Sequence, residues 1–274
     1  MKIKKLQLPW HILLCLIVFF MLFPIAFAVS NSFKTMSDAF NTILELIPAR
    51  PTLENYQYVF RKLPFLKITL NTLTIAVTVT AVKMVSSLFA AYSFVYFRYR
   101  GKTILYFLML TTMFVPFTVT MIPNYLLVSK LGLRDSIWGV VLPELADVIG
   151  IFLMRQAMRS IPVSLIEAAK MEDIPDWKIM KDIVLPLIRP AIISTGIIFF
   201  INAWNEYVWP VLILKTTEHY TLSLALQMFV SAEGGTQFTT AMAVSVMTIL
   251  IPLTLYIFFQ RQIVSTFAMS GVKG

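Results

Sequence analysis

The 274-residue chain is 58% hydrophobic and only 14% charged, and its mean hydropathy is +0.78. A soluble domain usually carries about 25% charged residues, so this composition excludes an ordinary globule in water. Helices that face lipid explain both the sparse charge and the apolar excess, which includes 22 Phe and 15 Met. We therefore expect an all-α polytopic membrane protein.

The net charge is +9, and the chain has one cysteine. In a soluble protein this charge would suggest a nucleic-acid partner, but no basic face lies outside the predicted loops. In a membrane protein, Lys and Arg are typically retained in cytoplasmic loops. The cysteine, Cys15, lies in an apolar run. A single cysteine excludes a disulfide framework and a cysteine-rich metal site.

Six windows are long and apolar enough to span a bilayer, which takes roughly 20 residues. They cover residues 10–29, 68–97, 104–128, 136–154, 191–214 and 241–259. No internal repeat or second soluble domain interrupts them. We predict a single six-helix domain over residues 1–274.

The first window also resembles a secretory signal. Lys2, Lys4 and Lys5 precede the apolar run, and Ala26-Phe27-Ala28 fits an A-x-A cleavage pattern. The apolar run is long for a signal peptide, which favours a retained first span.

Loop charge predicts the orientation. Lys and Arg are most concentrated in the segments that face the cytoplasm when both termini are inside, and the short turn Tyr99–Lys102 gives the clearest signal. The long outer segment Ser30–Lys67 contains three prolines, so we expect it to be part extended and part short helix.

The inner loop, residues 155–190, is polar but predicts two short helices that are not continuous with the spans. Ser164 and Glu167 fit a capping box, and Pro175 should stop this first helix. Asp173 could cap the second helix, and Asp176 suits its first turn.

The second helix of this loop would carry an apolar face formed by Trp177, Ile179, Met180, Ile183 and Val184. Such a helical knob in the cytoplasm could dock on a partner. The alternative is that Glu167 merely caps a helix.

Glu167-Ala168-Ala169, with Leu185-Pro186 eighteen residues after the glutamate, resembles the EAA loop of binding-protein-dependent ABC importer permeases. Further stretches resemble the carbohydrate-type members, relatives of the maltose and glycerol-3-phosphate permeases. They are Asn71-Thr72-Leu73, Leu131–Ser136, Ala203–Tyr207 with Trp209-Pro210, and the tail from Gln260 to Gly274. The resemblance covers nearly the whole chain in the same order.

The resemblance implies a type I importer permease fold in the bacterial inner membrane. The expected partners are a second homologous permease subunit, two ATP-binding cassette ATPase subunits, an extracytoplasmic solute-binding protein and membrane lipid. The solute would be a sugar, an oligosaccharide or a glycerol-phosphate-like compound. The chain itself would be no enzyme, because the ATPase partners would bind ATP and Mg.

In such importers the EAA helix sits in a cleft of an ATPase subunit, and closure of the ATPase dimer draws these helices together and opens the pathway outward. The implied coupling residues are Glu167, Ala168, Ala169, Met171, Asp173, Leu185 and Pro186. The C-terminal tail, with Ser270, Gly271 and Lys273, is a second implied contact with the ATPase.

One position departs from the pattern. EAA loops usually have glycine six residues after the glutamate, and this chain has Asp173. Glycine permits a left-handed turn between the helices. Aspartate tolerates that conformation less well, so the geometry of the loop is open.

Gly101-Lys102-Thr103 looks like the end of a phosphate-binding loop. That pattern needs glycine five residues before Gly101, where this chain has Tyr96, so we expect no ATP site here.

Ionisable groups within predicted spans are candidates for function. Lys83, Glu144, Asn202, Asn205 and Glu206 could line a solute pathway, with amides and carboxylates bonding sugar hydroxyls. Trp204, Tyr207 or Trp209 could stack on sugar rings. The alternative is structural: Lys83 would pair with Glu206, Glu144 or Asp147, and the tryptophans would form an interfacial belt.

Lys83, Asn205 and Glu206 also fit a proton or ion relay, so an ion-driven carrier is the second functional hypothesis. It leaves the cytoplasmic knob unexplained. A membrane scaffold fits the topology but leaves the ordered motifs unexplained.

Overall fold

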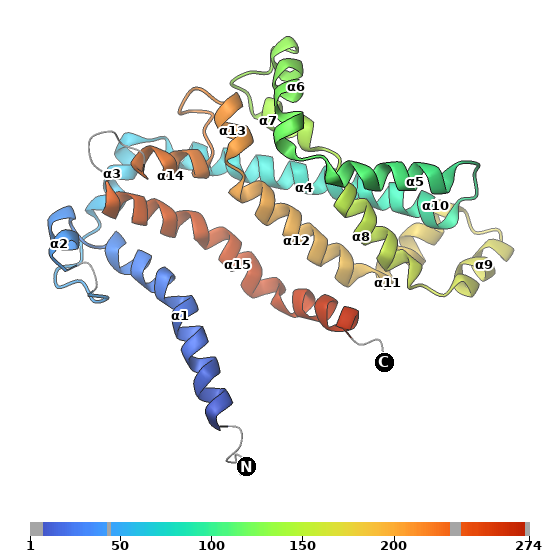
Figure 1. Ribbon diagram of the computed structural model, residues 1–274, viewed down its shortest axis with the longest axis horizontal. Helices are drawn as coiled ribbons and strands as arrows, with labels where there is room; N and C mark the ends of the chain where they lie inside the picture. The colour runs from blue at the N-terminus through green and yellow to red at the C-terminus, as the bar shows by residue number, and fades with distance from the viewer. Residues whose placement is uncertain (1–7, 43–44, 231–236, 272–274) are drawn as a thin grey trace. The chain divides into compact units, whose positions relative to one another are not determined.

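The computed structural model describes residues 8–42, 45–230 and 237–271, with side chains described up to residue 260. Within these ranges the regular structure is helical and there is no β-strand (Figure 1). Four helices are long and apolar enough to cross a membrane, and the number rises to six if each of two bent helix pairs is one span. The predicted all-α fold is confirmed.

The four straight candidates coincide with the first, second, fifth and sixth predicted windows. They are α1 (Leu8–Ser32), α4 (Phe65–Tyr96), α12 (Arg189–Asn205) followed by α13 (Val208–Ile213), and α15 (Phe238–Gly271). The most apolar stretch of α1 has no buried side chain, and Phe20 and Met21 are 70% and 71% exposed. A large exposed apolar surface of this kind fits contact with lipid.

The third predicted span is broken. It consists of α5 (Lys102–Thr111) with the 3₁₀ turn η2 (Thr112–Phe114), and α6 (Phe117–Lys130), which are bent by 96°. Pro116 lies between them in an extended conformation and has no N–H to continue the helical ladder. The prediction of one unbroken helix is wrong here, because mean hydropathy does not register a stop within an apolar run.

The fourth predicted span is broken as well, into α7 (Ile137–Val141) with the 3₁₀ turn η3 (Leu142–Glu144), and α8 (Val148–Arg159). The two parts are bent by 46°. Asp147 starts α8 as its N-cap residue, since its carboxylate accepts the N–H of Gly150 at 3.1 Å.

The chain divides into two compact units, and the first comprises residues 1–68 and 222–251. It includes α1, α14 (Leu222–Val230) and two short helices of the segment 30–67, α2 (Met36–Asn41) and α3 (Glu54–Lys62). These short helices confirm the expected mixture of extended and helical chain. The buried Lys34 donates from Nζ to the carbonyl oxygens of Thr42 and Glu45, both at 2.7 Å, and so folds the loop back on itself.

The second unit comprises residues 69–221 and 252–274. Its buried core joins α4, α8 and α12 to the polar loop, which contains α9 (Val163–Met171). The core side chains are those of Met84, Ala91, Tyr92, Met154, Met158, Ile161, Ile166, Ala169, Ile179, Val184, Ile188 and Phe199. The loop is therefore a packed part of this unit.

The first predicted helix of the loop is α9, but its predicted capping box is wrong. The helix begins at Val163 with Pro162 as N-cap residue and without a side-chain cap. Ser164 already lies inside the helix, whereas a capping serine needs the extended backbone that precedes it.

The second predicted helix is not a separate element. The short α10 (Asp176–Lys178), the π-helical turn η4 (Ile179–Val184) and α11 (Leu185–Leu187) follow one another directly, and only Ile188 separates them from α12. A π turn locally changes the hydrogen-bond register, and here it precedes Pro186, whose ring would disturb a regular α-helix. The N-cap residue of α10 is Pro175, so Asp173 does not cap it.

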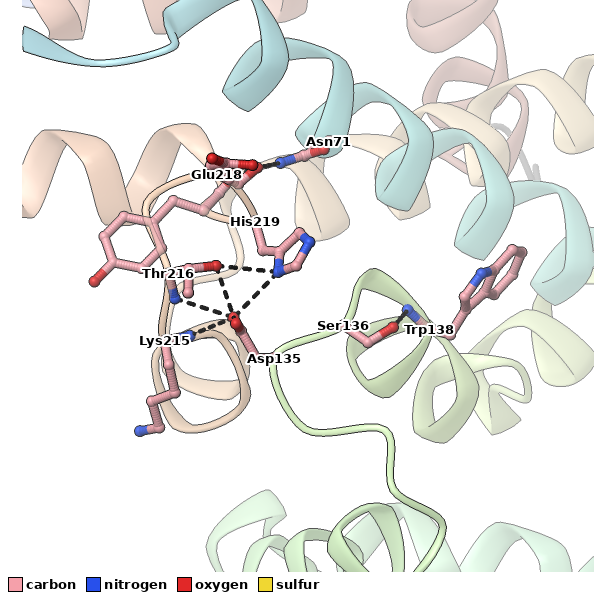
Figure 2. A network of polar contacts seen from close by, with 9 residues as sticks. Asn71, Asp135, Ser136, Trp138, Lys215, Thr216, Glu218 and His219 are labelled. Carbon is pink, nitrogen blue, oxygen red and sulfur yellow. Dashed lines mark hydrogen bonds and ion pairs between the residues drawn. The ribbon is translucent and has the colours of Figure 1, made fainter.

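A polar network fixes the loop between α13 and α14 (Figure 2). The carboxylate of Asp135 accepts hydrogen bonds from the backbone N–H groups of Lys215 and Thr216, at 2.8 and 3.0 Å, and from the Thr216 hydroxyl at 3.0 Å. His219 Nδ1 lies 3.3 Å from the same carboxylate. From α4, Asn71 Nδ2 donates to the carbonyl oxygen of Glu218 at 2.8 Å.

Two of the stretches that carry the family resemblance, around Asn71 and Asp135, therefore hold one loop in place. Desolvation raises the pKa of Asp135, but the hydrogen bonds from Lys215, Thr216 and His219 outweigh it and lower the pKa to about 2. The ionised carboxylate is the form that holds the loop.

We predict that Asp135→Gly lowers the free energy of unfolding by about 1–3 kcal/mol, because the loop loses bonds to a charged acceptor. Glycine accepts the φ of +54° at this position without strain, so the loss reports mainly on the carboxylate. Thermal unfolding of the purified protein measures it.

The pKa of Asp135 is depressed in the folded state, so its contribution is full above the unfolded pKa of about 4. The contribution is lost as the pH falls through about 2. The difference between the wild type and Asp135→Gly should be constant from about pH 8 to pH 5. A difference that already disappears near pH 6 would contradict this assignment.

Candidate functional site

The helix α9 presents one exposed face and one buried face. Glu167, Ala168 and Met171 are exposed, and Met171 has 81% of its surface accessible. Ile166 and Ala169 are buried in the core of the second unit. Of the two alanines among the implied coupling residues, only Ala168 is therefore exposed, and Ala169 instead holds α9 against its own chain.

Several contacts anchor this helix to the predicted spans. The Tyr92 hydroxyl on α4 donates to the Asp176 carboxylate at 2.9 Å, and Lys170 Nζ lies 3.5 Å from the same carboxylate. The Tyr96 hydroxyl donates to the carbonyl oxygen of Met158 at 3.1 Å, which joins the ends of α4 and α8. The exposed face of α9 is thus carried on a rigid base.

The turn after α9 is a left-handed helix end at Asp173. The N–H of Ile174 donates to the carbonyl oxygen of Ala169, and the N–H of Asp173 to that of Lys170, at 3.1 and 3.2 Å. This is the Schellman pattern, which places a residue with positive φ at the position of Asp173, and its φ is +54°. The chain keeps the turn that glycine usually makes, with aspartate in its place.

The sequence analysis missed one exposed residue on this loop. It placed Trp177 on an apolar face with Ile179 and Val184, which are buried, whereas Trp177 is 62% exposed. The register change in the π turn separates Trp177 from the residues that pack inward. Of the other predicted coupling residues, Leu185 is half-buried and Pro186 is exposed.

A second group of predicted residues meets around Lys83 on α4. Its Nζ lies 2.7 Å from Glu144 in η3 and 3.5 Å from Asp147 at the start of α8, and 12% of its side chain is exposed. Its ammonium also lies 5.7 Å from the centre of the Phe199 ring on α12. Of the three partners that the sequence left open, the structure selects Glu144 and Asp147.

Close packing holds this ion-pair group together. Ser86 donates to the carbonyl oxygen of Leu145 at 3.3 Å. A Cβ on Gly150 would collide with the Ser87 hydroxyl and the Phe199 ring, so glycine is needed where α8 meets α4 and α12. Charged groups inside a span are costly unless paired, and here the break between η3 and α8 supplies the partners.

A small cavity of about 60 Å³ adjoins the ion pairs. Lys83, Glu144, Asn202 and Glu206 contribute polar side chains to its lining, together with Ile75, Val79, Val140 and Ala203. This volume accommodates a few water molecules but no sugar ring. Lys83, Glu144, Asn202 and Glu206, all predicted for the pathway, are thus brought together around one small space.

Three further residues predicted for the pathway, Trp204, Asn205 and Trp209, are not part of the cavity lining. Trp204 is fully buried and stacks on Phe200, with 5.6 Å between the ring centres. Asn205 is exposed, and its amide donates to the carbonyl oxygen of Ile201 at 3.0 Å. Trp209 is buried too, and its indole N–H donates to the carbonyl oxygen of Gly139 at 3.2 Å.

The predicted contact of the C-terminal tail with the ATPase lies largely outside the residues that the structure describes. Ser270 and Gly271 belong to the end of α15, but their side chains are outside the described part of the chain, and so is Lys273.

Residues 83–266 match the family model of the binding-protein-dependent transport system inner membrane component. The chain belongs to this family. The matched range includes the Lys83 group, α9 and the Asp173 turn, and the resemblance to ABC importer permeases is confirmed. Membership of this family also argues against the hypothesis of an ion-driven carrier.

Curated relatives cover almost the whole chain. The arabinooligosaccharides transport system permease protein of Halalkalibacterium halodurans is 28% identical over 261 residues, which are 94% of this chain and 93% of the relative. The sn-glycerol-3-phosphate transport system permease protein of Yersinia pestis is 30% identical over 265 residues, 94% of each chain.

A solved structure has the same fold. It is a chain of a bacterial ABC transporter involved in the import of the acidic polysaccharide alginate, with a TM-score of 0.83 and 24% identity. The match covers 95% of this chain and 99% of that chain. The expected importer permease fold agrees with this likeness.

We predict that Asp173→Gly raises the free energy of unfolding by up to about 1 kcal/mol and that Asp173→Val lowers it by about 1–2 kcal/mol, since a β-branched residue is strained at positive φ. Thermal unfolding of the two variants measures the difference. Glu172→Val is the control, because Glu172 has a φ of −86° and no left-handed strain. Equal losses for the two valine variants would contradict the Schellman assignment.

Proposed function

We propose that this chain is one permease subunit of an ATP-driven, binding-protein-dependent importer of a sugar or sugar-like solute, with both termini in the cytoplasm. The observation that carries the proposal is the exposed face of α9, formed by Glu167, Ala168 and Met171 on a helix locked to α4 and α8. An exposed apolar and acidic face on a rigid base suits a socket in a partner.

The proposed partners are a second permease subunit, two ATPase subunits that bind ATP and Mg, and an extracytoplasmic solute-binding protein. Trp177 adds to the proposed ATPase contact, because it is a large exposed aromatic residue next to α9. Aromatic residues of this kind often dominate the binding energy of an interface. Pro186, in the same loop segment, is exposed as well.

Coupling would use two mechanical connections from the loop to the spans. One runs from α9 through Ile166 and Ala169 into the core shared with α4 and α8. The other is the helical run from α10 to α12, which is interrupted only at Ile188 and carries Asn202 of the cavity lining on α12. A pull on α9 by a closing ATPase dimer would then shift α8 and α12 against α4, where the Lys83 ion pairs lie.

The solute class rests on the relatives and on the cavity lining. The curated relatives are named for arabinooligosaccharides and sn-glycerol-3-phosphate. The proposed pathway passes the cavity, where Asn202 and Glu206 offer hydrogen-bonding groups to solute hydroxyls. The cavity would widen when the pathway opens, since its present volume of about 60 Å³ holds no sugar.

The docking proposal predicts that Glu167→Arg lowers solute-stimulated ATPase activity of the assembled importer by about tenfold or more, because charge-assisted contacts contribute about 1.5–3 kcal/mol. ATPase subunits should also co-purify in lower yield. Asp182→Arg is the matched control, because Asp182 is exposed in η4 and its substitution reverses the charge in the same way. Normal activity and normal assembly of Glu167→Arg would reject the proposed contact.

The pathway proposal predicts that Asn202→Ala together with Glu206→Gln raises the KM for uptake by roughly tenfold, the effect of losing one or two hydrogen bonds. Glutamine at position 206 keeps an acceptor for the N–H of Trp209, which Glu206 now accepts at 3.2 Å. Asn205→Ala, outside the cavity lining, should leave KM unchanged. An unchanged KM and solute preference in the double variant would exclude a direct contact.

A further inference from the structure

A second and larger cavity lies between α9 and the turn that joins α4 to α5. Its volume is about 890 Å³, and it is lined by residues of the end of α4, the start of α5, the end of α8 and the first turns of α9. Small-molecule sites usually have volumes of about 300–1,000 Å³. Neither the Lys83 group nor the small cavity is part of it.

The lining of this cavity is strongly cationic. Arg98, Lys102, Arg155, Arg159 and Lys170 contribute to it, against the single carboxylate of Glu167. Among the described residues, only Lys170 of these five cations has a carboxylate within 4.0 Å, that of Asp176. The cavity therefore concentrates positive charge that the chain leaves largely unneutralised.

Arg155 shows the same imbalance at the atomic level. Its guanidinium lies over the ring of Tyr106, 4.0 Å from the ring centre. Its Nε is buried and has no hydrogen-bond partner, which is uncommon for a buried donor. The guanidinium is therefore held by a ring face, and no carboxylate of the described residues lies within 4.0 Å of it.

The remaining lining is apolar. Apart from the Tyr96 hydroxyl, it is formed by apolar groups of Phe94, Val95, Tyr96, Phe97, Met158, Ile161, Val163 and Ile166, and Val163 is 64% exposed. A cavity with a ring of cations and an apolar wall fits a molecule with an anionic head and hydrocarbon chains. A small soluble anion would not contact the apolar part of the lining.

We propose that this cavity binds the phosphate headgroup of an anionic phospholipid, with the first part of its acyl chains along the apolar wall. The inference rests on the proposed orientation, which puts the α4–α5 turn and the ends of the spans at the cytoplasmic surface. Basic pockets between helices on that side of a membrane are suited to anionic headgroups. Because Ile166 and Glu167 form part of the wall, a bound lipid would also brace α9, the proposed coupling helix.

The test measures phospholipid binding to the assembled importer by native mass spectrometry with defined mixtures of phosphatidylglycerol and phosphatidylcholine. The variant is Arg98→Gln with Arg159→Gln, since both side chains are exposed and their loss should not disturb the core. Each basic residue near an anionic surface contributes about 1 kcal/mol, so the affinity for phosphatidylglycerol should fall roughly 30-fold. Binding of phosphatidylcholine should stay unchanged.

The matched control is Lys178→Gln with Lys181→Gln, which removes the same charge from exposed positions outside the cavity lining. An equal loss in the control, or no loss in the cavity variant, would overturn the proposal. Displacement of phosphatidylglycerol by excess inorganic phosphate alone would assign the site to a soluble anion instead. Loss of ATPase subunits with unchanged lipid binding would show that this surface is a protein interface.

Lipid binding needs no ATP turnover, so the outcome is separable from the proposed function. If the importer role failed, binding of phosphatidylglycerol would still be measurable. If lipid binding failed while Glu167→Arg still abolished coupling, only the lipid proposal would fall.

Discussion

The packing of the polar loop, residues 155–190, onto the ends of α4 and α8 is the constraint on which the rest of the second unit depends. Ile166, Ala169 and Ile179 are buried in the same core as Met154 and Met158. Fixed packing of this density transmits displacement, because protein interiors are close-packed and hardly compressible. A loop that was not packed against the spans could present the same exposed residues, but it would not transmit a displacement to α4 and α8.

Much of this arrangement could be predicted from the sequence, because it follows from composition over long windows. Four spans and the helical loop have strong apolar or polar signals that short-range context does not override. The sequence could predict that Lys83 pairs with an acidic side chain, because a charge in a span needs a partner. The choice of Glu144 and Asp147 needed the structure, because it depends on where the fourth span breaks.

The features that the sequence predicted wrongly depend on the local backbone conformation of one or two residues. Ser164 fits a capping box by spacing, but the N-cap residue of α9 is Pro162, two residues earlier than that box requires. Trp177 fits an apolar face only in a regular helix, and the π turn changes the register. The cavity beside α9 was also beyond prediction, since its cations come from segments far apart in the sequence.

The break at Glu206 and Tyr207 has a consequence for the kind of solute that the proposed pathway would accept. α12 ends at Asn205, close to the cavity lined by Asn202 and Glu206. The last carbonyl groups of a helix carry a partial negative charge, and in the lining two glutamates face one lysine. In the proposed pathway, this lining would favour neutral solutes that donate hydrogen bonds over a phosphate or a carboxylate.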